Sequence, residues 1–389
     1  MPLTKGLQQQ LTDIRRHIHR YPELSGEEIQ TTAYIRQLLE AADIEILSFP
    51  DLKTGIIAEI GTGESVIALR ADIDALPVQE ETGLPFASEI KGNMHACGHD
   101  FHTASLLGAA YLLKEQEHQL QGRVRLIFQP AEEKAKGAQQ VIASGVLEDV
   151  QAIFGLHNKP DLPVGTVGIR NGALMAAADG FIVEVAGVGT HAAVPEAGID
   201  PIVVSAHIVT ALQSIVSRNI SSQQGAVISV TQLNSGHVWN VIPDRAVLQG
   251  TIRTFDEQVR EQVLARFEQI VEGVANAFGT SAHIKWLSGP PPVLNDEQWT
   301  GAAHIAAEQS DLQVVEPAVS PASEDFSFYQ KEVPGVFIFV GTSGPQEWHH
   351  PSFDVDERAL SSTATFLANT ASVALKQAKQ YAISATHLS

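Results

Sequence analysis

Short, continuous runs of apolar residues recur in the first half of the chain and once near its end. Each closes on polar residues, and together they cover 65–74, 123–133, 152–158 and 335–343. Runs of this length without alternation are typical of strands buried on both faces of a sheet. Amphipathic stretches at 25–41, which opens with Ser25 and Glu28 in capping-box spacing, and at 103–116 predict helices. The order strand, helix, strand predicts an α/β domain with a mixed, mostly parallel sheet and helices on both faces.

Between about 180 and 288 the pattern changes to that of a smaller α+β domain. Its predicted strands and helices, in order, are 181–187 (strand), 200–219 (helix), 226–233 and 245–255 (strands), 256–279 (helix) and 281–286 (strand). This βαββαβ order is that of the split, ferredoxin-like unit. Three consecutive prolines within 288–296 cannot continue a helix or a central strand, so this stretch is expected to link back to the first domain. We therefore expect a catalytic domain in two parts, 1–179 and 291–389, with an inserted domain at 180–290.

The charge balance narrows the range of partners. The chain of 389 residues has 45 Asp and Glu against 25 Lys and Arg. This acidic excess argues against nucleic acid or an anionic membrane as a partner, because both would favour a basic surface. We find no apolar core of a signal peptide and no run of about 18 apolar residues. A single cysteine excludes an internal disulfide, and we expect a compact cytoplasmic protein.

The only cysteine lies in a stretch crowded with potential metal ligands. Cys97 is surrounded by His95, His99, Asp100 and His102, directly before a predicted helix. A lone cysteine or histidine is more often a packing residue than a ligand. A turn before a helix, however, can direct several side chains to one point. Cys97 and His99, with one residue between them, can bind one metal ion together if the backbone is extended there.

Further candidate ligands follow the predicted strands. They are Glu132 and Glu133 after the second strand, His157 at the end of the third, and His349 and His350 after the last. In such sheets, bound molecules and ions lie beyond the carboxyl ends of the strands, and these side chains are expected to lie there. A thiolate, a carboxylate and imidazoles suit zinc or a similar divalent ion, whereas calcium and magnesium prefer oxygen ligands. Of two adjacent glutamates, one can bind metal while the other acts as general base.

The predicted inserted domain contributes three candidates of its own. His191 projects from a glycine-rich turn, and Asn240 and Arg253 lie further along the same domain. An arginine there can clamp a substrate carboxylate through two hydrogen bonds, or it can face solvent. The local pattern alone leaves both interpretations open.

Taken together, the motifs closely resemble those of the M20 family of metallopeptidases and amidohydrolases. Within that family they are most similar to the branch of N-acyl-amino-acid, hippurate and auxin-conjugate hydrolases. The matching motifs span nearly the whole chain and are RRHIHRYPELSGEE, RADIDALPVQE, MHACGHDFHTASLLGAA, IFQPAEE, GLHNKPDLPVGTVG, GTHAAVPEAGIDPI, NVIPDRAVLQGTIRTF, PASEDFSFY and HHPSFDVDE. The first, third and fourth are specific in combination, although none is specific alone.

The resemblance implies a catalytic domain on a mixed α/β sheet and an inserted domain that serves lid closure and dimerisation. It implies a homodimer or homotetramer, and two divalent metal ions per subunit, which could be zinc, manganese, nickel or cobalt. The implied metal ligands are Cys97, His99, Glu133, His157 and His349, the last being the histidine two positions before the proline of the HHP motif.

The resemblance also implies catalytic and substrate-binding roles. Glu132 is expected to be the general base that takes a proton from a metal-activated water. His191 is expected to stabilise the oxyanion, reaching into the site of the partner subunit as in relatives. Asn240 and Arg253 match positions that hold the substrate carboxylate.

One motif separates the branches of this family. Classical peptidase members have a His-x-Asp motif where this chain has Asp72-Ile73-Asp74. The missing histidine points to the amidohydrolase branch and away from a general peptidase. Asp74 is expected to orient a metal ligand without binding metal itself, and its removal is expected to weaken metal binding.

The first hypothesis is hydrolysis of the amide bond of N-acyl amino acids, chiefly N-acetyl amino acids, to a carboxylic acid and a free amino acid. N-acetyl-diaminopimelate, hippurate, N-acyl cysteine derivatives and dipeptides remain open as substrates. A second hypothesis makes Cys97 a nucleophile activated by a neighbouring histidine, which leaves Glu132, Glu133, His157 and His349 unexplained. A third is a metal-binding protein that has lost catalysis, in which Glu132 would have no use. No role for His95 follows from the sequence.

Overall fold

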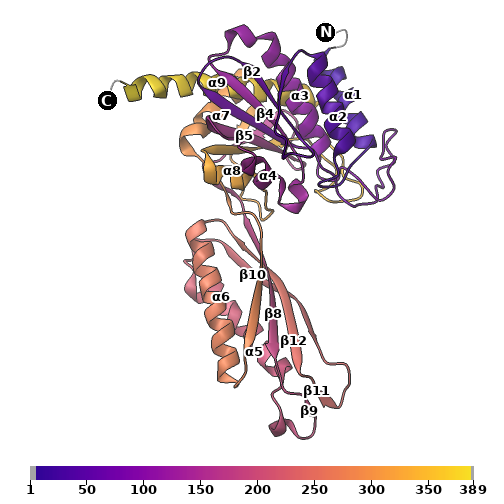
Figure 1. Cartoon of the computed structure of the whole chain (residues 1–389), viewed down its shortest axis with the longest axis vertical. Helices are drawn as coiled ribbons and strands as arrows, with labels where there is room; N and C mark the ends of the chain where they lie inside the picture. The colour runs from indigo at the N-terminus through magenta and orange to yellow at the C-terminus, as the bar shows by residue number, and fades with distance from the viewer. Residues whose placement is uncertain (1–5, 387–389) are drawn as a thin grey trace. The chain divides into compact units, whose positions relative to one another are not determined.

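The computed structural model describes residues 6–386, which form two compact units (Figure 1). The first unit consists of the chain up to Gly172, Leu294–Ala318 and the chain from Asp325 onward, and the second of Ala173–Val293 and Val319–Glu324. The predicted boundary at 179/180 lies inside strand β8 (Ala177–Ala186), all of which belongs to the second unit.

An eight-stranded sheet forms the centre of the first unit, in the order β1-β2-β4-β3-β5-β16-β6-β15. Its strands are β1 (Glu45–Leu47), β2 (Ile56–Gly61), β3 (Val66–Asp72), β4 (Arg123–Gln129), β5 (Val150–Lys159), β6 (Thr166–Gly168), β15 (Gln313–Val315) and β16 (Gly335–Gly341). The four central strands β4, β3, β5 and β16 run parallel, whereas β1, β2 and β6 pair antiparallel with their inner neighbours. The predicted mixed, mostly parallel sheet is therefore confirmed.

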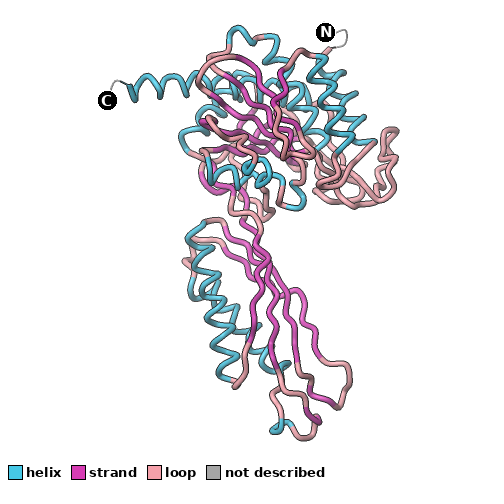
Figure 2. Tube along the Cα trace, in the orientation of Figure 1, coloured by secondary structure: helices cyan, strands magenta, loops and turns pink. Residues whose placement is uncertain are grey.

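Helices cover both faces of this sheet (Figure 2). They are α1 (Leu7–Arg20), α2 (Ile29–Ala41), α3 (His99–Glu115), α4 (Gly137–Ala143), α7 (Glu297–Gln309), α8 (Phe326–Glu332) and α9 (Ala359–Thr386). α3 packs against α1, α9 and β3, while α4 and α8 contact each other and lie over β4, β5 and β16. Because both faces are covered, β3 and β16 are buried at every position, which explains their unbroken apolar runs.

The helix predicted at 25–41 starts later than expected. α2 begins after Glu28, and no side chain caps it. Ser25 instead donates its hydroxyl hydrogen bond to Asp74 Oδ2 at 2.6 Å, and Glu28 Oε1 accepts from the backbone N–H of Ala131 at 2.9 Å. The capping-box prediction is wrong because tertiary contacts engage both side chains.

The second unit is an antiparallel sheet in the order β10-β12-β8-β13, with two helices packed on one face. Its further elements are α5 (Pro201–Ser214), β10 (Ala226–Ser235), β12 (Arg245–Thr254), α6 (Glu257–Ala277) and β13 (Ala282–Ser288), together with a short ribbon of β9 (Thr190–His191) and β11 (Val241–Ile242). Apart from this ribbon and short helical turns, the elements follow the predicted βαββαβ order. Phe181 of β8 and Phe267 of α6 lie at the centre of its core, with ring centroids 4.6 Å apart.

The segment Pro201–Asn219 is long and apolar enough, by length and composition alone, to cross a membrane. Val204, Ile208 and Leu212 on this segment are fully buried in the core of the second unit. Packing on the sheet accounts for this part of its apolar character.

Candidate metal centre

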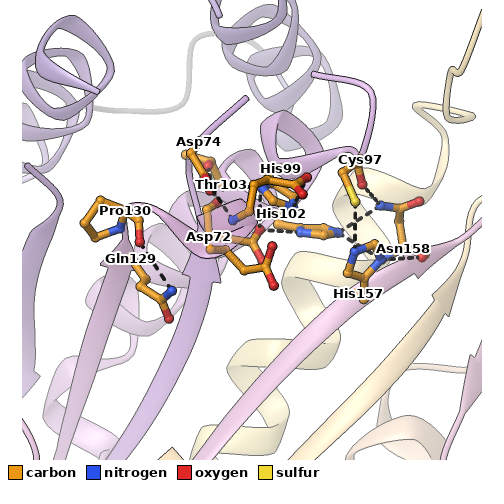
Figure 3. A network of polar contacts seen from close by, with 12 residues as sticks. Asp72, Asp74, Cys97, His99, His102, Thr103, Gln129, Pro130, His157 and Asn158 are labelled. Carbon is orange, nitrogen blue, oxygen red and sulfur yellow. Dashed lines mark hydrogen bonds and ion pairs between the residues drawn. The ribbon is translucent and has the colours of Figure 1, made fainter. Parts of the chain in front are cut away.

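Three of the predicted ligands meet at the carboxyl edge of the central strands (Figure 3). Cys97 lies in the loop before α3, His99 is the first residue of α3, and His157 lies near the end of β5. Cys97 Sγ is 3.3 Å from His157 Nε2, and ligand atoms of the three residues lie within 4.8 Å of one another. All three side chains are buried. The structure therefore provides a compact trio of one thiol and two imidazoles.

A second trio shares the same cysteine. Cys97, Glu133 and His349 also offer ligand atoms within 4.8 Å of one another, and His349 Nε2 is 3.7 Å from Glu133 Oε1. His349 has a left-handed backbone with φ of +66°, and its N–H donates to Ala96 O at 2.8 Å. The thiol of Cys97 thus belongs to both trios.

Two atoms at this centre are buried without a hydrogen-bond partner. Within the described chain, neither His99 Nε2 nor Glu133 Oε1 has one, and the two atoms are 3.9 Å apart. Burying unpaired polar atoms is unfavourable, and a cation between them would satisfy both. Thiolate, imidazole and carboxylate donors suit borderline divalent ions. The residues present therefore fit a pair of such ions.

Gly98 makes the spacing of the first two ligands possible. It has φ of +84°, and a Cβ at this position would lie 2.4 Å from Asn158 Nδ2. That same nitrogen donates to Cys97 O at 2.6 Å, and Asn158 O accepts from His157 Nδ1 at 2.8 Å. Asn158 thus orients the predicted ligands Cys97 and His157, and it leaves His157 Nε2 facing the thiol.

Asp74 supports the other side of the centre. Its Oδ1 lies 3.2 Å from His99 Nδ1, and its Oδ2 accepts from the backbone N–H of Glu133 at 3.0 Å. The Asp74 side chain is buried, and its oxygens are engaged by His99, by the backbone of Glu133 and by Ser25. It therefore holds His99 and Glu133 together without being placed as a metal ligand.

Burial and the surrounding carboxylates set the protonation of the centre. Burial lowers the pKa of His99, but Asp72, Asp74 and Glu133 outweigh it and raise the value to about 10. Burial raises the pKa of Glu133 to about 7. Mainly because of burial, the pKa of His157 is well below its usual value, so this imidazole is neutral. Cations must displace the protons that His99 and Glu133 otherwise hold, so metal affinity should decrease as pH falls.

The other histidines of the cysteine stretch lie outside the donor set. His102 Nδ1 bonds to Asp72 Oδ1 at 2.6 Å, and its Nε2 accepts from the backbone N–H of Asn158 at 2.9 Å. Both ring nitrogens of His95 are buried without a partner in the part of the chain described, and burial lowers its pKa to about 4. His102 is thus a support, whereas His95 is a neutral buried ring.

Asp100 is held by residues that the local pattern did not single out. Its Oδ2 accepts from Arg15 Nε at 2.8 Å and lies 2.8 Å from His19 Nδ1. Both partners come from α1, and their only sequence signal was the RRHIHR motif. This buried pairing fixes the first turn of α3, on which His99 lies.

The remaining predicted residues lie in two places. Glu132 belongs to a group with His99 and Glu133 whose ligand atoms lie within 4.8 Å of one another. His191 and Asn240 lie on the β9–β11 ribbon of the second unit or directly next to it. Arg253 is on β12 of that unit, where its Nη1 donates to Ile252 O at 3.0 Å. The catalytic and substrate-binding roles of these residues remain predictions.

Residues 68–372 match the model of peptidase family M20/M25/M40. The chain belongs to this family. The match covers most of the first unit and all of the second, so the predicted family is confirmed together with its fold class.

Relatives of this M20 chain have named activities. A Bacillus subtilis protein named N-acetyl-L-cysteine deacetylase is 54% identical over 364 residues, which cover 93% of this chain and 87% of that protein. A second B. subtilis protein, named N-acetylcysteine deacetylase, is 50% identical over 377 residues, covering 96% and 99%. Among solved structures, a dinuclear metal-binding M20 peptidase of B. subtilis has a TM-score of 0.87 at 47% identity, covering 95% of this chain and 99% of that one. These names agree with the predicted metal-dependent amidohydrolase and with two adjoining cation sites.

Asp74→Asn should weaken metal binding by about 10-fold to 100-fold, because an amide loses the charge that faces His99 and cannot accept at both oxygens. Competition with a chromophoric chelator measures the affinity, and circular dichroism checks the fold. Asp51→Asn, on the exposed surface, is the matched control and should bind metal as the wild type does. Unchanged affinity in Asp74→Asn would show that this carboxylate does not support the centre.

Proposed function

We propose that this M20 protein is a metal-dependent amidohydrolase that removes the acetyl group from N-acetyl amino acids, with N-acetylcysteine among its substrates. The observation that carries the proposal is Glu132 beside His99 and Glu133, in a donor set whose two trios both include Cys97. The two deacetylases of B. subtilis, similar over more than nine tenths of this chain, support the choice of an acetyl group.

Cys97, His99, Glu133, His157 and His349 would hold the two ions. When bound, such ions lower the pKa of a water molecule and polarise a carbonyl group, which supplies a nucleophile and an electrophile near neutral pH. Thiolate and imidazole donors favour zinc, nickel or cobalt, and manganese is the fourth candidate.

Glu132 and Glu133 are proposed to have different roles, because different parts of the chain contact them. The backbone N–H of Glu133 is fixed by Asp74, while Glu132 Oε1 accepts from the backbone N–H of Asp325 at 3.4 Å. Glu132 is partly exposed, so its carboxylate can take a proton from water and later deliver it to the departing amine. The adjacent pair thus supplies one metal ligand and one proton carrier.

His191 is suited to donate a hydrogen bond to the developing oxyanion. Its Nδ1 accepts from the backbone N–H of Ala193 at 3.1 Å, which leaves the proton of the neutral ring on Nε2. Asn240 and Arg253 are proposed to hold the substrate carboxylate. The guanidinium of Arg253 is only partly satisfied by oxygens of its own strand in the described residues, which leaves further donors for such a group.

A thiol mechanism is the second candidate, and one distance favours it. Cys97 Sγ lies 3.3 Å from His157 Nε2, the arrangement of a nucleophile and its base. The thiol is only 7% exposed, however, and this mechanism has no use for Glu133 or His349. The metal-dependent reaction accounts for all four side chains.

A substrate panel tests the proposal. We expect the highest kcat/KM for N-acetyl amino acids, and lower values for hippurate, N-acetyl-diaminopimelate and dipeptides, with release of free amine as the measured product. A chelator should abolish turnover, and zinc, manganese, nickel or cobalt should restore it. Turnover that survives complete metal removal and is lost on alkylation would support the thiol mechanism instead.

Glu132→Gln should keep its metal content and lose turnover by roughly 10²-fold to 10⁴-fold, because an amide cannot accept the proton from water. Metal analysis of the purified variant and kcat on an N-acetyl amino acid check both parts. Glu64→Gln, an exposed glutamate, is the control. Full activity in Glu132→Gln would remove this residue from the mechanism.

We also propose that the second unit mediates a homodimer, or the dimers of a homotetramer. Exposed apolar residues lie on or next to its β9–β11 ribbon, which is at one end of the sheet of this unit (Figure 1); they are Val188, Val194, Val238, Trp239 and Val241. Trp239 is 94% exposed, and large exposed apolar side chains that gather in one region mark interaction sites. Since the same ribbon carries His191, an interface here would bring this residue to the partner subunit.

Trp239→Asp should dissociate the oligomer, because a carboxylate cannot be buried unpaired at an apolar interface. Light scattering coupled to size exclusion should then give the mass of a single chain. Leu287→Asp, also exposed but on edge strand β13, should leave the mass unchanged. A wild type that is itself monomeric would contradict the proposed dimer.

A further inference from the structure

The loop between β4 and α4, which carries Glu132 and Glu133, has an unusual backbone. Ala131 and Ala135 flank its single 3₁₀ turn and have φ of +54° and +51°. Residues with a Cβ rarely adopt this left-handed conformation, and it persists only where surrounding contacts enforce it. Contacts from outside the loop must therefore hold it in place.

The two ends of this loop, residues 130–136, almost touch. A Cβ on Gly137 would lie 1.6 Å from Pro130 O and 2.7 Å from Gln129 Nε2, so that only glycine fits there. A loop closed so tightly transmits a displacement of either end to Glu132. The contacts at its two ends therefore determine where the carboxylate of Glu132 lies.

Asp325 bonds to both ends of the loop. Its carboxylate accepts from Gln129 Nε2 at 2.9 Å, just before the loop, and from the backbone N–H of Ala138 at 3.0 Å, just after it. Its own backbone N–H donates to Glu132 Oε1 at 3.4 Å. Asp325 thus contacts the chain just before the loop, just after the loop and at Glu132 itself.

Arg70 holds the carboxylate of Asp325 in place. Both side chains are completely buried, and Arg70 Nη2 lies 2.8 Å from Asp325 Oδ1. The same guanidinium bonds to Asp72 Oδ2 at 2.6 Å and to Gln129 Oε1 at 2.8 Å. Because the guanidinium is a rigid fork, it fixes Asp325 and Gln129 relative to strand β3.

We propose that Asp325 is a positioning residue for Glu132, which it fixes relative to the cation site without touching the substrate. This inference rests on the proposed function, because it takes Glu132 as the general base. A misplacement of about 1 Å in a reacting group can lower the rate on the order of a hundredfold. Glu133 lies on the same loop, but Asp74 bonds both to its backbone N–H and to His99, and Asn158 supports Cys97, so a change of Asp325 should affect metal binding far less than kcat.

Asp325→Asn is the direct test. Asparagine has nearly the same shape, but one of its two terminal atoms is a donor, so it cannot accept from both Ala138 and Arg70. We expect kcat to fall about tenfold to a hundredfold, while KM and metal content stay within about twofold of the wild type. A wild-type kcat, or a loss explained by lower metal content, would overturn the inference.

A double variant separates positioning from general destabilisation. If Asp325 acts through Glu132, Asp325→Asn should cause no further loss of rate in a Glu132→Gln background, measured in single turnovers at high enzyme concentration. A loss in that background as large as in the wild type would show that Asp325 acts on something else.

The matched control is Glu59→Gln. Glu59 is on β2, and its carboxylate lies 2.7 Å from the guanidinium of Arg125. Arg125 is on β4, the strand that carries Gln129, but nearer the beginning of that strand. Breaking this ion pair should change thermal stability but leave kcat unchanged. A fall in kcat comparable to that of Asp325→Asn would mean that any weakening of the sheet lowers the rate, and would overturn the inference.

A milder variant keeps the proposal testable if Asp325→Asn does not fold. Tyr329→Phe removes only the hydroxyl that bonds to Gln129 Oε1 at 2.9 Å. It should lower kcat about twofold or more at unchanged metal content. An unchanged kcat would count against the proposal that Asp325 and Gln129 position Glu132. Full activity in Glu132→Gln would overturn the proposed function, whereas an inactive Glu132→Gln with wild-type kcat in Asp325→Asn would overturn this inference alone.

Discussion

The candidate metal centre depends on one unfavourable arrangement, the buried imidazole of His99 and the largely buried carboxylate of Glu133, whose inner atoms have no partner among the described residues. His99 Nε2 and Glu133 Oε1 are held 3.9 Å apart, too far for a hydrogen bond. Their protonation is already abnormal, with pKa values of about 10 and about 7. Such an arrangement is stable only if a cation or a shared proton compensates for it, which couples the fold of the centre to metal binding.

The surrounding polar network makes that arrangement possible. Asp74 and Asn158 orient the donors, and the buried Asp72 lies between Arg70 and His102, with which it bonds on both sides. A buried carboxylate without such partners would be strongly destabilising, and both Asp72 and Asp74 are matched by donors. These contacts pre-organise the centre and leave only the inner atoms of His99 and Glu133 unpartnered among the described residues.

The parallel sheet explains how distant residues reach this centre. The carboxyl ends of β3, β4 and β5 lie at one edge, which brings Asp72, the Glu132 loop and His157 together across some 85 positions of sequence. The chain then uses left-handed residues at Gly98, Ala131 and His349 to aim side chains that regular strands and helices could not aim. Strain of this kind is typical of functional sites, where surrounding contacts compensate for it.

The α/β fold and the inserted βαββαβ unit follow from patterns along the sequence, which also predict a set of donor residues. Unbroken apolar runs, helical periodicity and the spacing of cysteine, histidine and glutamate are local signals. The tertiary structure was needed to show that Ser25 and Glu28 bond away from the α2 helix, that His102 bonds to Asp72 and Asn158, and that Cys97 lies within reach of two groups of donors. It alone also revealed Asp325 bonded to a loop almost 200 residues earlier in the chain. Hydrogen bonds and charge pairing between elements far apart in sequence depend on how the strands are ordered in the sheet, and no local pattern encodes that order.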